Sequence, residues 1–224
     1  LSLLEFLKKD EKILKETIEL SCQTKDFYKA FQCLFKFKKF YDYSFFNNLK
    51  TILYFKTLEY IHNENIINHK KVVCKLVDKL FNVVSEKEIK IRNALLNEKE
   101  IAENKILLLS KPRKLQVVLT NKCNLRCVMC DFHEYDWNFN ECQINELKSL
   151  IPYLEYLIWQ GGEVFLNKDF FYLFNLALEY DVKQTIITNG LLINENVAKN
   201  IVQNNISLAI SIDDVEKEGY EKIR

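Results

Sequence analysis

Three cysteines lie close together near the middle of the chain, at Cys123, Cys127 and Cys130. They follow the run Leu115–Thr120, whose residues favour a β-strand, so a loop that leaves a strand is expected to carry all three thiols. Thiolates are ligands of zinc and of iron–sulfur clusters. Three of them can hold a metal ion or a cluster while one coordination position stays open. That open position is where we expect the chemistry of this chain.

Three further polar segments follow β-favouring runs later in the chain. They comprise Gly161, Gly162 and Glu163 after the second run, Asn189 and Gly190 after the third, and Ser211, Asp213 and Asp214 at the end of the fourth. In parallel α/β folds the ligand site lies at the carboxyl ends of the strands, so these segments are expected to meet beside the cysteines. Three of the 4 glycines in the chain lie at these strand ends, which suggests close approach of the backbone to a ligand.

The second part of the chain, residues 111–224, alternates β-favouring runs with helical patterns. Strands are predicted at 115–120, 156–160, 183–188 and 207–212, and helices at 144–150, 169–180 and 194–204. Near-continuous apolar runs such as Ile186–Ile187 are typical of parallel strands covered on both faces. Four βα repeats, the last one incomplete, predict an α/β fold with a parallel sheet or part of a βα barrel.

The first part, residues 1–110, contains neither glycine nor proline and follows helical periodicity. Helices are predicted at 2–20, 26–41, 44–62 and 67–84, with a last helix that begins at a Ser85–Glu88 capping box and runs to about Lys105. An all-α helical domain is therefore expected. Pro112 cannot continue a helix, and we place the boundary between the two domains near it.

The composition is that of a globular protein with reduced thiols. No apolar run approaches the roughly 18 to 20 residues of a membrane span, so no membrane association is expected. The formal net charge of +1 does not favour nucleic acid as a partner. An odd count of 7 cysteines without a secretory leader predicts a cytoplasmic protein. Cys22, Cys33 and Cys74 match no ligand spacing and are predicted to be small buried residues.

Taken in order, these motifs resemble the radical S-adenosylmethionine (radical SAM) superfamily. The resemblance rests on the cysteine spacing, GGE at 161–163, TNG at 188–190, SIDD at 211–214 and YEKIR at 220–224. The sequence is most similar to the branch that carries a C-terminal auxiliary-cluster (SPASM-like) domain. The resemblance covers residues 111–224. It implies a partial TIM-like barrel normally built from six βα units, of which this chain holds about four.

The resemblance also implies a cofactor and a reaction. Cys123, Cys127 and Cys130 would ligate a [4Fe-4S] cluster whose fourth iron binds the amino and carboxylate groups of S-adenosyl-L-methionine. Reductive cleavage would then give methionine and a 5′-deoxyadenosyl radical that abstracts a substrate hydrogen. A reductant such as flavodoxin or ferredoxin is implied as a partner. The substrate class that the resemblance favours is a peptide or protein residue, with a sugar or another small metabolite next.

Six residues at the later strand ends are implied to contact S-adenosyl-L-methionine: Gly161, Gly162, Glu163, Asn189, Ser211 and Asp213. The segment 161–163 matches the motif that holds the methionine ammonium. The two residues after the fourth strand, Ser211 and Asp213, are candidates for contacts with the ribose or the carboxylate, and Asn189 is a further candidate.

Other interpretations of the cysteines stay open. The same three thiols with His133 would also suit a Cys3His zinc site, and Cys142 is a candidate for an additional ligand. The corresponding function is a non-catalytic helical interaction module joined to a zinc-bearing or degenerate α/β remnant. In the enzyme interpretation, the helical domain would recognise the substrate or a partner.

Overall fold

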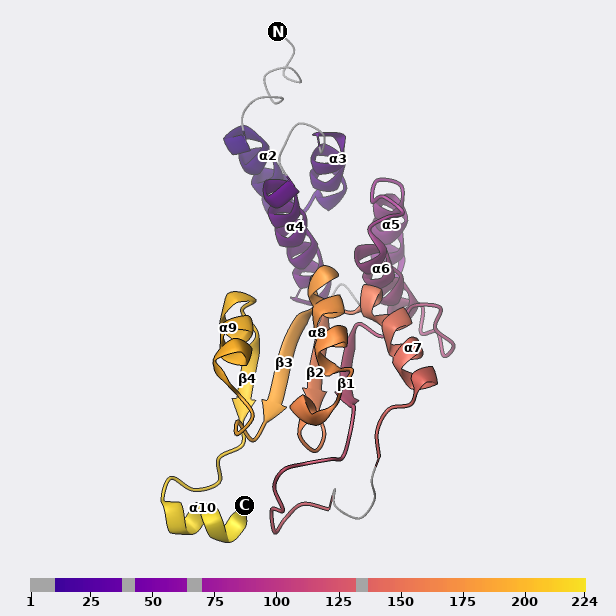
Figure 1. Ribbon diagram of the computed structural model, residues 1–224. Coiled ribbons are helices and arrows are strands. Elements are labelled where there is room, and N and C mark those ends of the chain that lie inside the picture. Colours follow the sequence, from indigo (N-terminus) through magenta and orange to yellow (C-terminus); the bar gives the residue numbers. More distant parts are fainter. Residues whose placement is uncertain (1–10, 38–42, 64–69, 132–136) are drawn as a thin grey trace. The chain divides into compact units, whose positions relative to one another are not determined.

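The computed structural model describes residues 11–37, 43–63, 70–131 and 137–224, which form two compact units, Leu1–Lys111 and Pro112–Arg224 (Figure 1). Each unit has its own hydrophobic core. The predicted fold class, an α/β region with four parallel strands preceded by helices, is confirmed. Among the described residues, no helix has both the length and the apolar character needed to cross a membrane.

Five helices of the first unit are described: α2 (Glu11–Gln23), α3 (Phe27–Phe37), α4 (Tyr43–Asn63), α5 (Lys70–Phe81) and α6 (Ile89–Ala102). The first predicted helix lies partly outside the described residues. Apolar side chains at helical spacing meet in one core, in which Phe31, Leu53 and Leu80 are fully buried. This packing of amphipathic faces supplies most of the stability that isolated helices lack.

The predicted capping box at Ser85 is wrong. Ser85 Oγ accepts a hydrogen bond from the N–H of Lys87 at 3.3 Å, and the Ser85 carbonyl accepts from the N–H of Glu88 at 3.0 Å. These bonds close a local turn that competes with helix initiation. Helix α6 therefore begins at Ile89, and Glu88 precedes it without a side-chain cap. The helix also ends before Lys105, because Asn104 adopts a φ of 54°.

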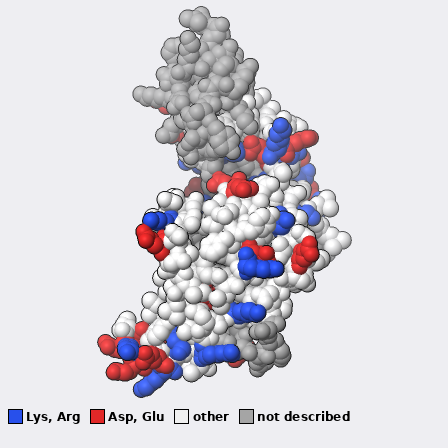
Figure 2. All heavy atoms as spheres, in the orientation of Figure 1, with Lys and Arg blue, Asp and Glu red and all other residues white. Residues whose placement is uncertain are grey.

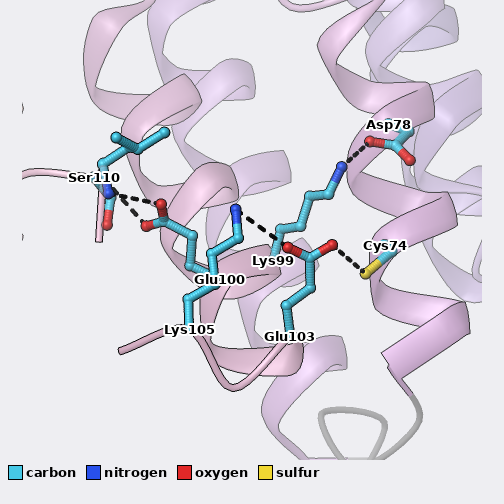
Figure 3. Close-up of polar contacts among 8 residues, drawn as sticks. Cys74, Asp78, Lys99, Glu100, Glu103, Lys105 and Ser110 are labelled. Carbon is cyan, nitrogen blue, oxygen red and sulfur yellow. Dashed lines mark hydrogen bonds and ion pairs between the residues drawn. The ribbon is translucent and has the colours of Figure 1, made fainter. Parts of the chain in front are cut away.

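Polar contacts join α5 to α6 and to the segment that follows α6 (Figure 3). Lys99 Nζ lies 2.6 Å from Asp78 Oδ1, and Lys105 Nζ lies 3.3 Å from Glu103 Oε2. The Cys74 thiol donates a hydrogen bond to Glu103 Oε1 at 3.6 Å. Burial and the Glu103 carboxylate both raise the pKa of Cys74, so this cysteine stays protonated and is a poor metal ligand.

Glu100, near the end of α6, fixes the backbone of the segment that leads to the second unit. Its buried carboxylate accepts hydrogen bonds from the N–H of Leu109 at 2.7 Å and of Ser110 at 3.2 Å (Figure 3). The side chain of Asn93 holds Lys111 in the same way, accepting from its N–H at 2.7 Å and donating to its carbonyl at 3.0 Å. Two side chains on α6 therefore replace the strand or helix partners that this extended segment lacks.

We expect Glu100→Gln to lower the free energy of unfolding by about 1–3 kcal/mol at neutral pH, because the N–H groups of Leu109 and Ser110 lose an anionic acceptor. Burial acts to raise the pKa of Glu100, but hydrogen bonds from Ser110 and Leu109 outweigh it, and the pKa lies below its ordinary value of 4.5. The stabilisation is therefore complete above that value and is lost as the pH falls through the lowered pKa.

Urea denaturation between pH 7 and pH 3 measures this difference. Wild-type protein should lose stability more steeply on acidification than Glu100→Gln. Glu86→Gln, at an exposed position before α6, is the control and should follow the wild type. Parallel stability curves for the wild type and Glu100→Gln would contradict the assignment.

In the second unit, four parallel strands pair in the order β1 (Lys114–Val118), β2 (Tyr156–Gln160), β3 (Lys183–Thr188) and β4 (Ser207–Ile210). They alternate with α7 (Glu141–Leu150), α8 (Phe170–Glu179) and α9 (Glu195–Gln203). Right-handed crossovers between neighbouring strands place these helices on one face of the sheet (Figure 1). The second and third strands match the predicted ranges, whereas the first and last end two residues earlier than predicted.

The core of this unit lies between the sheet and the helices. Trp159 is fully buried, and its Nε1 donates to Gln184 Oε1 at 2.6 Å. The amide of Gln184 in turn donates to the Phe174 carbonyl at 3.2 Å, so both buried polar groups are satisfied. On the other face, side chains such as Ile158 and Ile187 are only half-buried. Within the described residues the sheet is therefore covered on one face, not on both as predicted.

A last helix, α10 (Lys217–Ile223), was not among the predicted elements. Its sequence is rich in charges of both signs. Figure 2 shows acidic and basic side chains intermixed over this helix, and Lys217 lies 3.9 Å from Glu221 one turn later. Such pairs support a short exposed helix.

Candidate metal and cofactor site

The loop that follows β1 carries the three cysteines, and hydrogen bonds join its two ends. The N–H of Phe139 donates to the Leu119 carbonyl at 2.9 Å, and the N–H of Asn121 donates to the Trp137 carbonyl at 3.1 Å. The N–H of Trp137 donates back to Asn121 Oδ1 at 2.6 Å. We call residues 119–139 the cysteine loop. The thiols therefore lie on a closed loop at the carboxyl end of the first strand.

The cysteines of this loop differ in exposure. Cys127 is buried, whereas Cys123 and Cys130 are half-buried. The N–H of Cys130 donates to the Cys127 carbonyl at 3.0 Å, which forms a tight turn between the two. The N–H of Leu125 donates to Cys123 Sγ at 3.4 Å.

The ligand side chains on the cysteine loop can be compared with those that a zinc ion and a four-iron cluster require. Within the described ranges, no three Cys, His, Asp or Glu side chains converge on a point that could hold one metal ion. Zinc and a four-iron cluster both take thiolate ligands, and the cluster binds each thiolate at a separate iron. His133, the fourth ligand of the zinc interpretation, lies outside the described residues. Three thiols on one closed loop fit a cluster that keeps one iron open.

Gly161 and Gly162 bring the end of β2 directly against the cysteine loop. The N–H of Gly162 donates to the Thr120 carbonyl at 2.8 Å, and the N–H of Glu163 donates to the Lys122 carbonyl at 2.7 Å. Gly161 has a φ of 138°, and a Cβ on it would lie 2.4 Å from the Thr120 oxygen. A Cβ on Gly162 would lie 2.3 Å from the Lys122 oxygen. The missing side chains therefore allow two backbones to meet.

Glu163 ties the end of β2 to the end of β3. Its side chain is fully buried, and the Thr188 hydroxyl lies 2.8 Å from both carboxylate oxygens. The N–H of Asn189 donates to Glu163 Oε2 at 3.0 Å. A buried carboxylate requires such donors. The structure thus gives Glu163 an internal role, and its contact with a methionine ammonium stays a prediction.

Asn189 links the end of β3 to the first cysteine. Its Nδ2 donates to Asn124 Oδ1 at 2.8 Å and lies 3.7 Å from Cys123 Sγ. The N–H of Leu191 donates to Asn189 Oδ1 at 3.0 Å, which fixes the orientation of the amide. The structure therefore brings a predicted cofactor-contacting residue next to a predicted metal ligand.

Ser211 and Asp213 lie just beyond the end of β4. The N–H of Ser211 donates to the Thr188 carbonyl at 2.9 Å, which places Ser211 beside the residue that holds Glu163. Asp213 forms an ion pair with Nη2 of Arg224. All four strand ends thus meet around the cysteine loop, as the parallel arrangement predicts.

Sequence reasoning missed Arg224 at this site. Its Nη1 donates to Cys127 Sγ at 3.3 Å, and the N–H of Val128 donates to the Ile223 carbonyl at 2.8 Å. Burial acts to lower the pKa of Arg224, but the hydrogen bond to Cys127 and the attraction of Asp213 outweigh it and raise the pKa. The guanidinium is therefore a fixed positive charge beside a predicted ligand. The only sequence signal for it was its place in the YEKIR motif.

The remaining cysteines show no ligand arrangement in the described part of the chain. Cys142 lies in the first turn of α7 and is exposed. Cys22, Cys33 and Cys74 are half-buried in the helical unit, whereas burial was predicted. Burial raises the pKa of Cys22, which disfavours its thiolate.

The helical unit carries a hollow of its own, formed by α2, α3 and α4. Its volume is about 410 Å³, and it is lined by Glu19, Cys22, Gln23, Lys25, Phe27, Lys56, Glu59 and Tyr60. That volume falls in the range of small-ligand sites. The lining combines both charge signs with an aromatic ring.

Comparison with known protein families gives a match for most of the second unit. Residues 117–224 match the model of the Radical SAM superfamily. The match begins inside β1 and includes the cysteine loop, the glycine segment and α10.

Similar proteins include several with known names. The chain is 34% identical over 128 residues to Fe-coproporphyrin III synthase of Methanosarcina barkeri, covering 53% of this chain and 32% of that protein. It is 29% identical over 119 residues to a probable GTP 3',8-cyclase of Methanocaldococcus jannaschii, covering 50% and 40%. It is 33% identical over 85 residues to an S-adenosylmethionine-dependent nucleotide dehydratase of Selenomonas ruminantium, covering 35% and 30%. The chain therefore spans less than half the length of each of these relatives.

Among solved structures, the crystal structure of Streptococcus suis SuiB bound to S-adenosylmethionine is similar to this chain. The sequence identity is 21%, the TM-score is 0.46, and the match covers 76% of this chain and 42% of SuiB.

Proposed function

Because residues 117–224 match the model of the Radical SAM superfamily, we propose that the chain belongs to it and that Cys123, Cys127 and Cys130 hold a [4Fe-4S] cluster that acts with S-adenosyl-L-methionine. When bound, the cluster supplies the electron that cleaves S-adenosyl-L-methionine to methionine and a 5′-deoxyadenosyl radical, which abstracts a hydrogen from the substrate. The observation that carries this proposal is the closed loop of three thiols held against the glycine segment at the end of β2.

In this proposal, residues at different strand ends bind different parts of the cofactor. Gly161 and Gly162 allow close backbone approach, so their segment holds the methionine ammonium together with Glu163. The Glu163 carboxylate also keeps the second and third strand ends together through Thr188. The residues assigned to the ribose and carboxylate ends are Ser211 and Asp213, with Asn189 as a further contact. Their positions around one loop support this assignment.

We propose a peptide or protein residue as the substrate, recognised by the helical unit. The hollow in that unit supports this choice, because Glu19, Lys56 and Tyr60 offer the mixed charge and aromatic surface that suit a peptide. A small metabolite is the second candidate, favoured by relatives whose names refer to a coproporphyrin, to GTP and to nucleotides. An auxiliary-cluster domain of the SPASM type, a flavodoxin or ferredoxin reductant and a cytoplasmic location complete the proposal for the whole protein.

Anaerobic reconstitution of the full-length protein with iron and sulfide tests the proposed cofactor. We expect about four irons and four sulfides per chain and a broad absorption band near ~400 nm. Adding S-adenosyl-L-methionine should change the electron paramagnetic resonance spectrum of the reduced protein, and dithionite should then yield 5′-deoxyadenosine. Protein that holds stoichiometric zinc and takes up no iron would contradict the proposal and favour the interaction module.

A further inference from the structure

Arg224 lies between the cysteine loop and the end of β4. Its Nη1 donates to Cys127 Sγ at 3.3 Å, its Nη2 pairs with Asp213, and its side chain is only 12% exposed. The bond from the Val128 N–H to the Ile223 carbonyl, 2.8 Å long, holds the end of α10 against the same loop. The guanidinium is thus fixed by contacts on two sides and directed at a thiol that the proposed function makes a ligand.

The third guanidinium nitrogen, Nε, differs from the two that contact Cys127 and Asp213. Nε of Arg224 is buried and makes no hydrogen bond within the part of the chain that the structure describes. A buried donor that is left unsatisfied is costly, most of all in a charged group. It therefore indicates an acceptor that the surrounding side chains do not supply. A cluster bound through Cys127 brings sulfur atoms and negative charge to this position.

We propose that Arg224 is a positioning residue that raises the reduction potential of the cluster by donating hydrogen bonds to its sulfur atoms. The inference rests on the proposed function. Hydrogen bonds to sulfur and the charge around a cluster are among the factors that set its potential. A positive donor stabilises the reduced form, which carries one more negative charge, more than the oxidised form. The ion pair of Nη2 with Asp213 orients the planar guanidinium so that its Nη1 faces Cys127.

A potentiometric titration of the reconstituted full-length protein, followed by electron paramagnetic resonance, tests this role. At a fixed potential, the ratio of reduced to oxidised cluster in Arg224→Gln should fall about tenfold, a shift of about 59 mV for a one-electron couple. Arg224→Lys keeps the charge but loses the planar fork, so an intermediate shift is expected. The matched control is Lys222→Gln, which removes a positive charge from an exposed position on the same helix and should leave the potential unchanged.

Each outcome decides the question. Equal potentials for the wild type and Arg224→Gln overturn the inference and leave the proposed function standing. An equal shift in Lys222→Gln also overturns it, because the effect would then come from net charge. If Arg224→Gln takes up no iron, the reduction potential is measured in Arg224→Lys instead. A wild-type potential in Arg224→Lys then overturns the inference. Wild-type protein that binds no cluster overturns the proposed function and this inference with it.

Discussion

Cys127→Ala is expected to remove the cluster from the reconstituted protein, with iron content falling from about four per chain to less than one. Only three thiols lie on the cysteine loop, so the loss of one leaves two ligands. Iron binding should weaken more than about 100-fold, because losing even the outer partners of metal ligands typically costs 10–100-fold. Formation of 5′-deoxyadenosine should fall to background. Iron analysis and anaerobic product assays measure both effects.

Cys142→Ala is the matched control for this variant. Cys142 is exposed in α7, so its replacement should leave iron content and product formation at wild-type levels. Full iron content in Cys127→Ala would contradict the proposed ligand set. A loss of iron in Cys142→Ala would show that this residue is an additional ligand.

Gly162→Ala is expected to damage both the fold and the site. The added Cβ would lie 2.3 Å from the Lys122 carbonyl oxygen and 2.5 Å from that of Asn121. Both neighbours are backbone atoms, so the cysteine loop itself has to move, at a cost of about 3 kcal/mol in the free energy of unfolding. Because Cys123 follows Lys122 directly, iron uptake should fall as well. Urea denaturation of the protein before reconstitution and iron analysis after it separate the two effects.

Gly190→Ala makes the same chemical change in different surroundings. A Cβ at Gly190 would meet only the Ile210 side chain, at 3.3 Å, although the φ of 82° is unfavourable for alanine. A cost of about 1–2 kcal/mol and retained iron uptake are expected. Equal damage from the two variants would show that strained backbone, and not the contact with the cysteine loop, explains the effect at Gly162.

The sequence was sufficient for those features of the site that depend on local pattern. The β-favouring run Leu115–Thr120 placed the thiols on a loop after β1, and later runs of the same kind located Tyr156–Gln160 and Lys183–Thr188 as they occur. Parallel topology then required the strand ends to meet. These features could be predicted because strand propensity and the alternation of strands and helices depend on short stretches of sequence.

Features that depend on distant partners were not predictable in this way. Glu163 carries a carboxylate suited to a ligand, but which partner it takes depends on how Thr188 packs across the strand ends. Ser85 fits a helix cap by spacing, yet a bond to Lys87 closes a turn instead. Arg224 approaches Cys127 from 97 residues away in sequence. Long-range hydrogen bonds of this kind leave no periodic signal.

The bonds that close the cysteine loop at Leu119 and Asn121 bear on how metal enters the site. Closing a loop costs chain entropy. Here the backbone hydrogen bonds of the protein itself hold the loop closed and offset that cost. Once one thiolate is bound to iron, the other two act as an intramolecular chelate at an effective concentration of the order of millimolar or higher. Domains that fold around zinc depend on the metal for their structure. This unit has its own apolar core, so under the proposed function we expect the apoprotein to fold before the cluster binds.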